Sequence, residues 1–191
     1  MEDKELIQKY LEGDKEAYGV LVKKFKTKVF NLAYSMTHDR EVADDLAQEI
    51  FIKVYFSLKT FQFKSKFGTW LYRVAINHIR DFLRKKGRIK HVSLENIVER
   101  PMIQEDETVI REKESQEEQR RDLVYKVLGT LPEKYRMILT LRDMQGISYR
   151  DITKILSIAP GTVDSRLFRA RKMLREKLKP FLSQKGGSHE M

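Results

Sequence analysis

The stretch ISYRDITKILSIAPGTVDSRLFRARKMLREKL, residues 147–178, decides the fold of the C-terminal part of this chain. Apolar residues recur at helical spacing after Ser148, whose residue type is a common helix N-cap. Residues 157–159 make a short break. Pro160 follows where a first-turn proline is tolerated, because its missing N–H has no helical partner there. The spacing therefore predicts two helices joined by a tight turn.

The second of these helices combines one apolar side with basic and short polar faces. Apolar residues recur three or four apart from Val163 to Leu178, so that side is expected to be buried. The remaining faces carry Thr162, Ser165, Arg166, Phe168, Arg169, Arg171 and Lys172. Cations for phosphates and short polar groups for base edges suit a helix that lies in a DNA major groove. The alternative is an ordinary amphipathic helix with a solvated basic face, and the pattern favours DNA binding.

Composition bounds the fold class. The chain has 191 residues, 41% of them hydrophobic and 35% charged, which fits one domain or two small ones. Nine Gly and four Pro leave little turn chemistry for a many-stranded fold. We therefore predict an all-α protein with two small helical domains joined by a flexible linker, the C-terminal one a helix-turn-helix.

Several classes of site are not predicted. With no cysteine, disulfides and thiolate metal sites are excluded, and the four histidines lack metal-ligand spacing. There is no Gly-rich phosphate loop and no nucleophile motif, so we expect no catalytic residue, no metal and no cofactor. No apolar run approaches the roughly 20 residues of a membrane span, and the start MEDKE is unlike a signal peptide. We expect a cytoplasmic protein that is not an enzyme.

The net charge of +10 changes sign along the chain. Residues 1–90 hold 19 Lys and Arg against 12 Asp and Glu, a net charge of +7. Residues 91–120 have a net charge of −5, and residues 121–191 have +8. The acidic stretch coincides with the loss of apolar periodicity. Two polyanion-binding units joined by an acidic connector are therefore expected.

Apolar periodicity places the helices and the domain boundaries. Helices are expected near residues 4–12, 14–36, 39–58, 68–86, 118–128, 132–144, 149–156 and 160–178. Gly87 stands where a helix is expected to stop. We predict domains at residues 1–90 and 118–182, an acidic linker at 91–117 and a disordered tail at 183–191.

Three segments together resemble the extracytoplasmic-function sigma factors of bacterial RNA polymerase. They are ADDLAQEIF at residues 43–51, KFGTWLYRVAIN at 66–77, and GTVDSRLFRAR at 161–171 with LPEKYR ahead of it at 131–136. The resemblance covers about residues 5–180. It implies that residues 1–90 are sigma region 2, which binds core polymerase and recognises and helps melt the −10 element. It also implies that residues 118–182 are sigma region 4, which reads the −35 element.

Asp45, Gln48 and Glu49 are the candidate polymerase-binding residues. They fall three and four apart and so share one side of a helix. Members of the family contact the coiled coil of the polymerase β′ clamp with a matching DLxQE surface. An acidic face in a basic domain suits a basic partner and steers docking. The resemblance implies polymerase core, through β′ clamp and β flap, and promoter DNA as partners.

The candidate −10 residues lie in the loop after residue 58 and on the helix that follows it. Aromatic rings stack unpaired bases while Lys and Arg follow the backbone. By resemblance, a flipped base sits in a pocket that includes Phe61 and Asn77. The candidate residues are Phe61, Lys64, Ser65, Lys66, Asn77, Arg80, Arg84, Lys85 and Arg88. Trp70 matches the first of two tryptophans that wedge the duplex in the housekeeping sigma factor, but Leu71 stands at the second. We therefore favour a core position for Trp70.

The candidate −35 residues lie at the start of the last helix. They are Thr162, Asp164, Ser165, Arg166, Phe168, Arg169 and Arg171. Asp164 departs from the basic residue often found there in relatives. Its carboxylate either accepts a hydrogen bond from a cytosine amino group or caps its own helix turn, and the sequence leaves both readings open.

Two rival functions remain. One is a stand-alone helix-turn-helix regulator, which needs a dimer and a palindromic site, and the other is an interaction module for RNA or acidic proteins. The basic N-terminal block counts against the first. As a sigma factor, the chain is expected to be a monomer when free, to be held inactive by an anti-sigma factor, and not to insert into the membrane directly.

Overall fold

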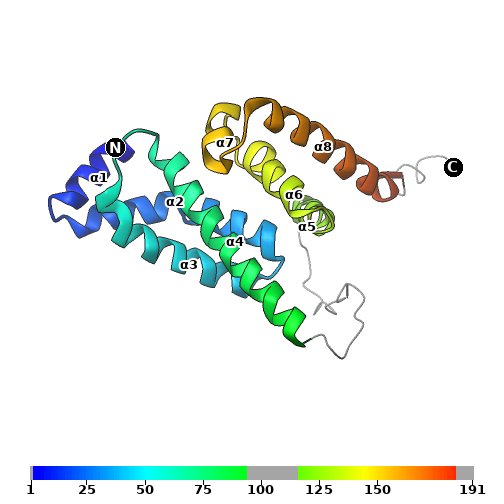
Figure 1. Ribbon diagram of the computed structural model, residues 1–191, viewed down its shortest axis with the longest axis horizontal. Coiled ribbons are helices and arrows are strands. Elements are labelled where there is room, and N and C mark those ends of the chain that lie inside the picture. Colours follow the sequence, from blue (N-terminus) through cyan, green and yellow to red (C-terminus); the bar gives the residue numbers. More distant parts are fainter. Residues whose placement is uncertain (1, 94–115, 184–191) are drawn as a thin grey trace.

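The structure is a computed structural model that describes residues 2–93 and 116–183. Side chains are described for residues 2–87 and 120–181. Every regular element in these ranges is helical, as predicted (Figure 1). The elements in chain order are α1 (Asp3–Leu11), α2 (Lys15–Thr37), α3 (Arg40–Ser57), η1 (Leu58–Thr60), α4 (Phe67–Ser93), α5 (Gln116–Gly129), α6 (Glu133–Leu139), η2 (Thr140–Met144), α7 (Tyr149–Leu156) and α8 (Pro160–Ser183).

The N-terminal unit is built from α1 to α4. Asp14 caps α2 by accepting backbone hydrogen bonds from Glu16 and Ala17, and Asp39 caps α3 in the same way. His38, with φ +56°, reverses the chain between these two helices. The apolar stripes of α2, α3 and α4 then meet in one core, where Leu32, Ile50 and other large side chains are buried.

The C-terminal unit is built from α5 to α8, and its last two helices form the predicted helix-turn-helix. The hydroxyl of Ser148 accepts a hydrogen bond from the backbone N–H of Asp151 at 3.1 Å and so caps α7. Ser157, with φ +53°, ends α7, and Pro160 begins α8. Both sequence signals for this motif are therefore confirmed.

Two details differ from the sequence-based expectation. Gly87 does not end its helix, because α4 continues to Ser93. A glycine stops a helix only where the backbone turns left-handed, and within a helix it costs about 1 kcal/mol relative to alanine. The second difference is η2, a π-helical turn that follows α6 directly and that periodicity alone could not predict.

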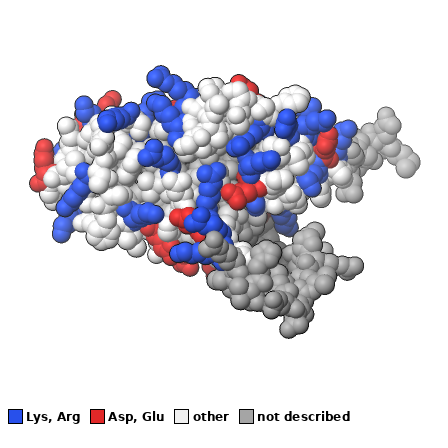
Figure 2. Space-filling view, in the orientation of Figure 1, with Lys and Arg blue, Asp and Glu red and all other residues white. Residues whose placement is uncertain are grey.

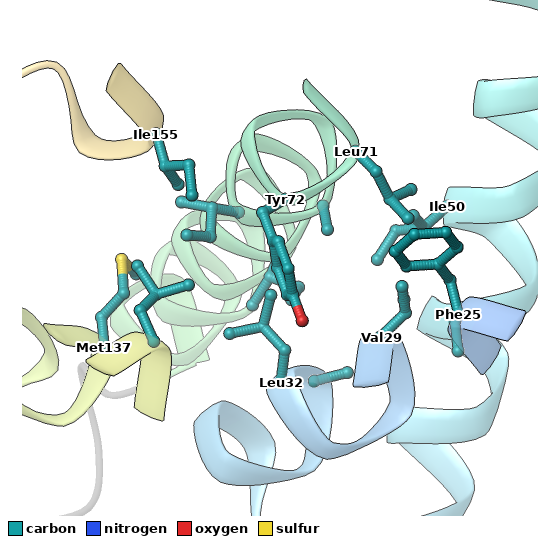
Figure 3. Packing of buried hydrophobic residues seen from close by; sticks show 14 of the residues in the cluster. Phe25, Val29, Leu32, Ile50, Leu71, Tyr72, Met137 and Ile155 are labelled. Atoms are coloured by element: carbon teal, nitrogen blue, oxygen red, sulfur yellow. The ribbon is translucent and has the colours of Figure 1, made fainter. Parts of the chain in front are cut away.

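The two units lie against each other and share one apolar core. α4 packs along α7, and α2 contacts α5, α6 and η2. Figure 3 shows side chains of α2, α3 and α4 on one side and Met137 and Ile155 of the C-terminal unit on the other, with Tyr72 between them. Met137, Ile155 and Tyr72 are all buried. The prediction of two helical domains is thus confirmed, and the structure adds that they are packed together.

The predicted linker and tail fall mostly outside the described residues. Of the linker, residues 94–115 are not described, and the same holds for residues 184–191 of the tail. Among the residues that are described, none of the helices combines the length and apolarity needed to cross a membrane.

Candidate nucleic-acid interface

The acidic side chains of α3 form an exposed face. Asp45, Gln48 and Glu49 are all exposed, as their spacing predicts. The Gln48 amide donates to the carboxylate of Asp44 at 2.9 Å. Glu49 lies 2.7 Å from Nε2 of His78 on α4, so this carboxylate is held in place between two helices. The carboxylates of this face are therefore open to cationic side chains of a partner.

Phe61 is buried, unlike the open position expected for a loop aromatic. Only 7% of its surface is exposed, and its ring centroid lies 4.9 Å from that of Phe63, 5.3 Å from Trp70 and 6.0 Å from Phe67. Trp70 is half-buried and packs against the core, which agrees with the favoured reading of this residue. The structure therefore places Phe61 in the wall of an aromatic cluster, next to the more exposed Phe63.

The polar candidates for −10 binding differ in accessibility. Asn77, Lys64, Lys66 and Lys85 are exposed, and Ser65 is half-buried. Arg84 pairs with Asp81 of its own helix at 2.9 Å. Arg80 is half-buried and lies 3.5 Å from the carboxylate of Glu133, which belongs to the C-terminal unit. The side chain of Arg88 falls outside the described part of α4. Figure 2 shows Lys and Arg side chains over both units on this view, with fewer Asp and Glu among them.

Two further polar contacts join α4 to the C-terminal unit. Thr69 donates to the carboxylate of Asp151 at 3.1 Å, and Tyr72 donates to Gln145 at 3.1 Å. The hydrogen bond from Ser148, followed by that from Thr69, lowers the pKa of Asp151, so this carboxylate stays ionised in the contact. Burial raises the pKa of Tyr72 to about 12, so its hydroxyl remains a donor.

Arg136 makes another contact between the units, at the end of α2. Its Nη1 atom lies 2.8 Å from Nε2 of His38 and 3.4 Å from the backbone oxygen of Met36. Burial and the neighbouring guanidinium lower the pKa of His38 to about 4. Arginine can only donate, so this Nε2 accepts and His38 is neutral. The Nε atom of Arg136 is buried without a hydrogen-bond partner among the described residues.

The N-terminal half of α8 is open on the side predicted to read bases. Asp164, Ser165 and Arg169 are exposed, and Phe168 has 72% of its surface exposed. Thr162 and Arg166 are half-buried. A groove of about 500 Å³ runs beside Phe168 and is also lined by Tyr149 of α7. Short polar groups, an aromatic ring and a cation thus lie together, as contact with base edges in a groove requires.

Arg171 lines the same groove, but its guanidinium is paired within the fold. Its guanidinium makes a two-pronged ion pair with Asp143, at 2.6 Å and 3.0 Å, and this raises the pKa of Arg171. The pair ties α8 to η2 and occupies the Nε–Nη2 edge of the guanidinium. Arg171, one of the candidate −35 residues, therefore contributes to the packing of α8 on η2 in this structure.

Sequence reasoning missed the residues that join the two units. Thr69, Tyr72, Gln145 and Asp151 carry no shared motif and lie more than 70 positions apart in their pairs. Thr69, Tyr72 and Asp151 look like ordinary polar positions of amphipathic helices, and Gln145 looks like an ordinary turn residue. Only an observed contact between distant segments reveals them. Within the described ranges, no group of three or more His, Asp or Glu side chains is arranged to hold a metal ion.

Comparison with known proteins identifies both units. Sigma-70 region 2 matches residues 21–89, and Sigma-70, region 4 matches residues 121–174. The chain is 36% identical over 188 residues to the RNA polymerase sigma-H factor of Pseudomonas aeruginosa, covering 96% of this chain and 97% of that one. It is 35% identical over 185 residues to the ECF RNA polymerase sigma-E factor of Escherichia coli K12, covering 94% of this chain and 96% of that protein.

Solved structures agree with these relatives. The sigma factor RpoE of Bartonella quintana, in complex with the anti-sigma factor NepR, superposes with a TM-score of 0.69 at 25% identity, over 85% of this chain and 96% of that one. CnrH, in complex with the cytosolic domain of CnrY, has the same fold, with a TM-score of 0.68 at 23% identity over 93% and 97% of the two chains. This chain therefore belongs to the extracytoplasmic-function group of the sigma-70 family, and it is a sigma factor that directs RNA polymerase to promoters.

Proposed function

We propose that the two units of this sigma factor divide promoter recognition between them. The N-terminal unit, residues 1–90, binds core polymerase and the −10 element, and the C-terminal unit, residues 118–182, reads the −35 element. The observation that carries this division is that α4 and α8 each present exposed cations beside an exposed hydrogen-bonding side chain, Asn77 in one and Ser165 in the other. Residues 91–117 connect the units, and residues 183–191 form the tail.

The acidic face of α3 is the proposed docking surface for core polymerase. Asp45, Gln48 and Glu49 are exposed together on a chain whose net charge is +10. Carboxylates in such a setting favour a basic protein surface over DNA, because DNA phosphates repel them. The proposed partner is the coiled coil of the β′ clamp, and the C-terminal unit meets the β flap.

At the −10 element, α4 and the loop before it suit single-stranded DNA. The exposed amide of Asn77 offers both a donor and an acceptor to a base edge. Lys64 and Lys66 neutralise phosphates nearby, and Phe61 with Phe63 supplies an aromatic wall beside a flipped base. Binding unpaired DNA more tightly than duplex is what helps melt the promoter, so no catalytic residue is required.

Promoter binding requires the two units to separate. At 3.4 Å per base pair, roughly 85 Å of B-DNA lies between positions −35 and −10. In the structure α4 instead packs directly on α7, and Arg80 pairs with Glu133 of the C-terminal unit. The packed arrangement is therefore proposed as the form of the free monomer in the cytoplasm.

An anti-sigma factor is the proposed regulator. RpoE and CnrH, which share this fold, were solved in complex with NepR and with the cytosolic domain of CnrY, and the first of these partners is named as an anti-sigma factor. A protein that binds the packed arrangement opposes the separation that promoter binding needs.

Run-off transcription tests the proposal. Core polymerase with this chain should initiate on members of a pool of genomic promoter fragments. Asn77→Ala should reduce open-complex formation, followed by permanganate reactivity of unpaired thymines, about tenfold while leaving core affinity unchanged, since one good base contact contributes about 1–3 kcal/mol. Gln8→Ala on α1, an exposed amide far from α4 in sequence, is the matched control and should behave as the wild type.

Two results would contradict the proposal. If Asn77→Ala lowers core affinity as much as promoter opening, the residue does not contact the melted DNA. If core polymerase with this chain initiates on no fragment, while the chain alone shifts palindromic duplex, the chain is a stand-alone regulator instead.

A further inference from the structure

The acidic face of α3 continues as an apolar one toward the C-terminal end of the helix. Ile52 and Phe56 follow Asp45 by seven and eleven residues and therefore lie on the same side of α3 as Asp45 and Glu49. At 1.5 Å per residue, Asp45 and Phe56 are about 16 Å apart along the helix axis. The result is one stripe of about three turns, polar at its start and apolar at its end.

The apolar end of this stripe is open to solvent. Ile52 has 58% of its surface exposed and Phe56 has 74%, the largest value for a large apolar residue among those described. The ring of Phe56 meets Tyr55 edge-on, at 5.4 Å between centroids, which leaves its outer side uncovered. Ile50 and Val54, on the opposite side of the same helix, are fully buried. Ile52 and Phe56 therefore contribute little to the packing of the core.

Covering these two side chains is energetically favourable. Burying an Ile or Phe side chain stabilises a complex, because it removes apolar area from water. Adjacent carboxylates contribute mainly to orientation and association rate, because exposed charges are screened. In such a stripe the apolar side chains supply affinity for a partner, and the carboxylates fix the orientation in which the partner binds.

We propose that Ile52 and Phe56 extend the polymerase-docking surface of α3 and supply much of its affinity. The occupant is a helix of the core polymerase that places cations against Asp45 and Glu49 and apolar side chains against Ile52 and Phe56. A long helical arm fits because the stripe is straight and continuous over three turns. This inference rests on the proposed docking role of the acidic face.

Affinity for core polymerase is the decisive measurement. Ile52→Ser and Phe56→Ser should each weaken binding of the full chain to core about tenfold, measured by competition with a labelled sigma factor, with no change in melting temperature. Phe56→Leu should recover most of the affinity, because it restores apolar surface. Val20→Ser on α2 is the matched control, since Val20 is 51% exposed but lies on another helix, and it should leave core affinity unchanged.

Salt dependence separates the two parts of the stripe. The losses from Asp45→Asn and Glu49→Gln should shrink as ionic strength rises, whereas those from Ile52→Ser and Phe56→Ser should persist. If the acidic variants weaken binding while Ile52→Ser and Phe56→Ser match Val20→Ser, the apolar extension is wrong and the acidic docking surface stands. If no variant of the stripe changes core affinity, the docking surface and its extension both fail.

Discussion

At the scale of single residues, Phe61 in the loop between η1 and α4 is buried rather than open to solvent. Its ring packs against Phe63, Phe67 and Trp70, so it contributes to the stability of the N-terminal unit as well as to any wall for a base. The sequence indicated an aromatic residue in a basic loop. It gave no sign of burial, because periodicity informs only on helices and strands.

Phe61→Ala should lower the free energy of unfolding by about 3 kcal/mol, since removing a buried phenyl group leaves a cavity. Phe63→Ala, on the exposed side of the same cluster, should cost less than about 1 kcal/mol. Urea denaturation followed by circular dichroism gives both values. Equal losses would mean that Phe61 is not the buried member of the pair.

At the scale of the elements, amphipathic patterning predicted every described α-helix. Ends marked by capping residues, such as Ser148 before α7 and Asp39 before α3, were predicted within a residue. The end of α4 was not, because Gly87 is compatible with both a stop and a helix interior. The exposed acidic face of α3 was also predictable, since spacing alone decides which side chains share a side.

Ser148→Ala should destabilise the helix-turn-helix by about 1 kcal/mol, because it removes the N-cap of α7 and the hydrogen bond that Ser148 donates to Asp151 at 2.6 Å. Ser165→Ala, in the interior of α8, is the control and should be neutral or slightly stabilising, since alanine is the better helix former. Thermal unfolding at pH 7 compares the two. A loss from Ser165→Ala as large as that from Ser148→Ala would contradict the capping role.

At the scale of the whole molecule, the packing of the two units was beyond sequence reasoning. It depends on pairs such as Tyr72 with Gln145 and Tyr34 with Tyr125, whose rings lie 4.9 Å apart. Nothing in the sequence around one member of a pair identifies the other member. Such contacts depend on which helix surfaces meet when the two units pack together. The sequence predicted two units and their charges. It did not predict that part of α4 faces the C-terminal unit.

The contact between the units should weaken as pH falls from 7.5 to 5. His38 titrates at about 6.5 when free and at about 4 in the packed form, so the separated form binds more protons between these values. Neutral His38 therefore stabilises the packed form fully above pH 6.5, and this stabilisation is lost as the pH falls toward 4. Asp151, whose pKa is lowered below its usual 3.8, stays ionised throughout this range.

Energy transfer between dyes on the two units measures this change, and introduced cysteines at Lys9 and Lys177 are suitable because the chain has no native cysteine. Transfer should fall reversibly at pH 5 in the wild type. His38→Gln, which cannot take up a proton in this range, should show no such fall. An identical pH profile in both proteins would mean that His38 does not control the contact.

The ion pair between Arg80 and Glu133 has a consequence for how the free chain competes for DNA. A cation that neutralises a phosphate releases a condensed counterion, and each such contact steepens the dependence of log affinity on log salt by about 0.9. While Arg80 is paired with Glu133, it neutralises no phosphate, so no counterion is released from DNA at this position. The apparent affinity for DNA is also multiplied by the fraction of molecules that are open, so it falls as the packed form becomes more populated. The free sigma factor should therefore bind bulk chromosomal DNA more weakly, and with a shallower salt slope, than its polymerase-bound form.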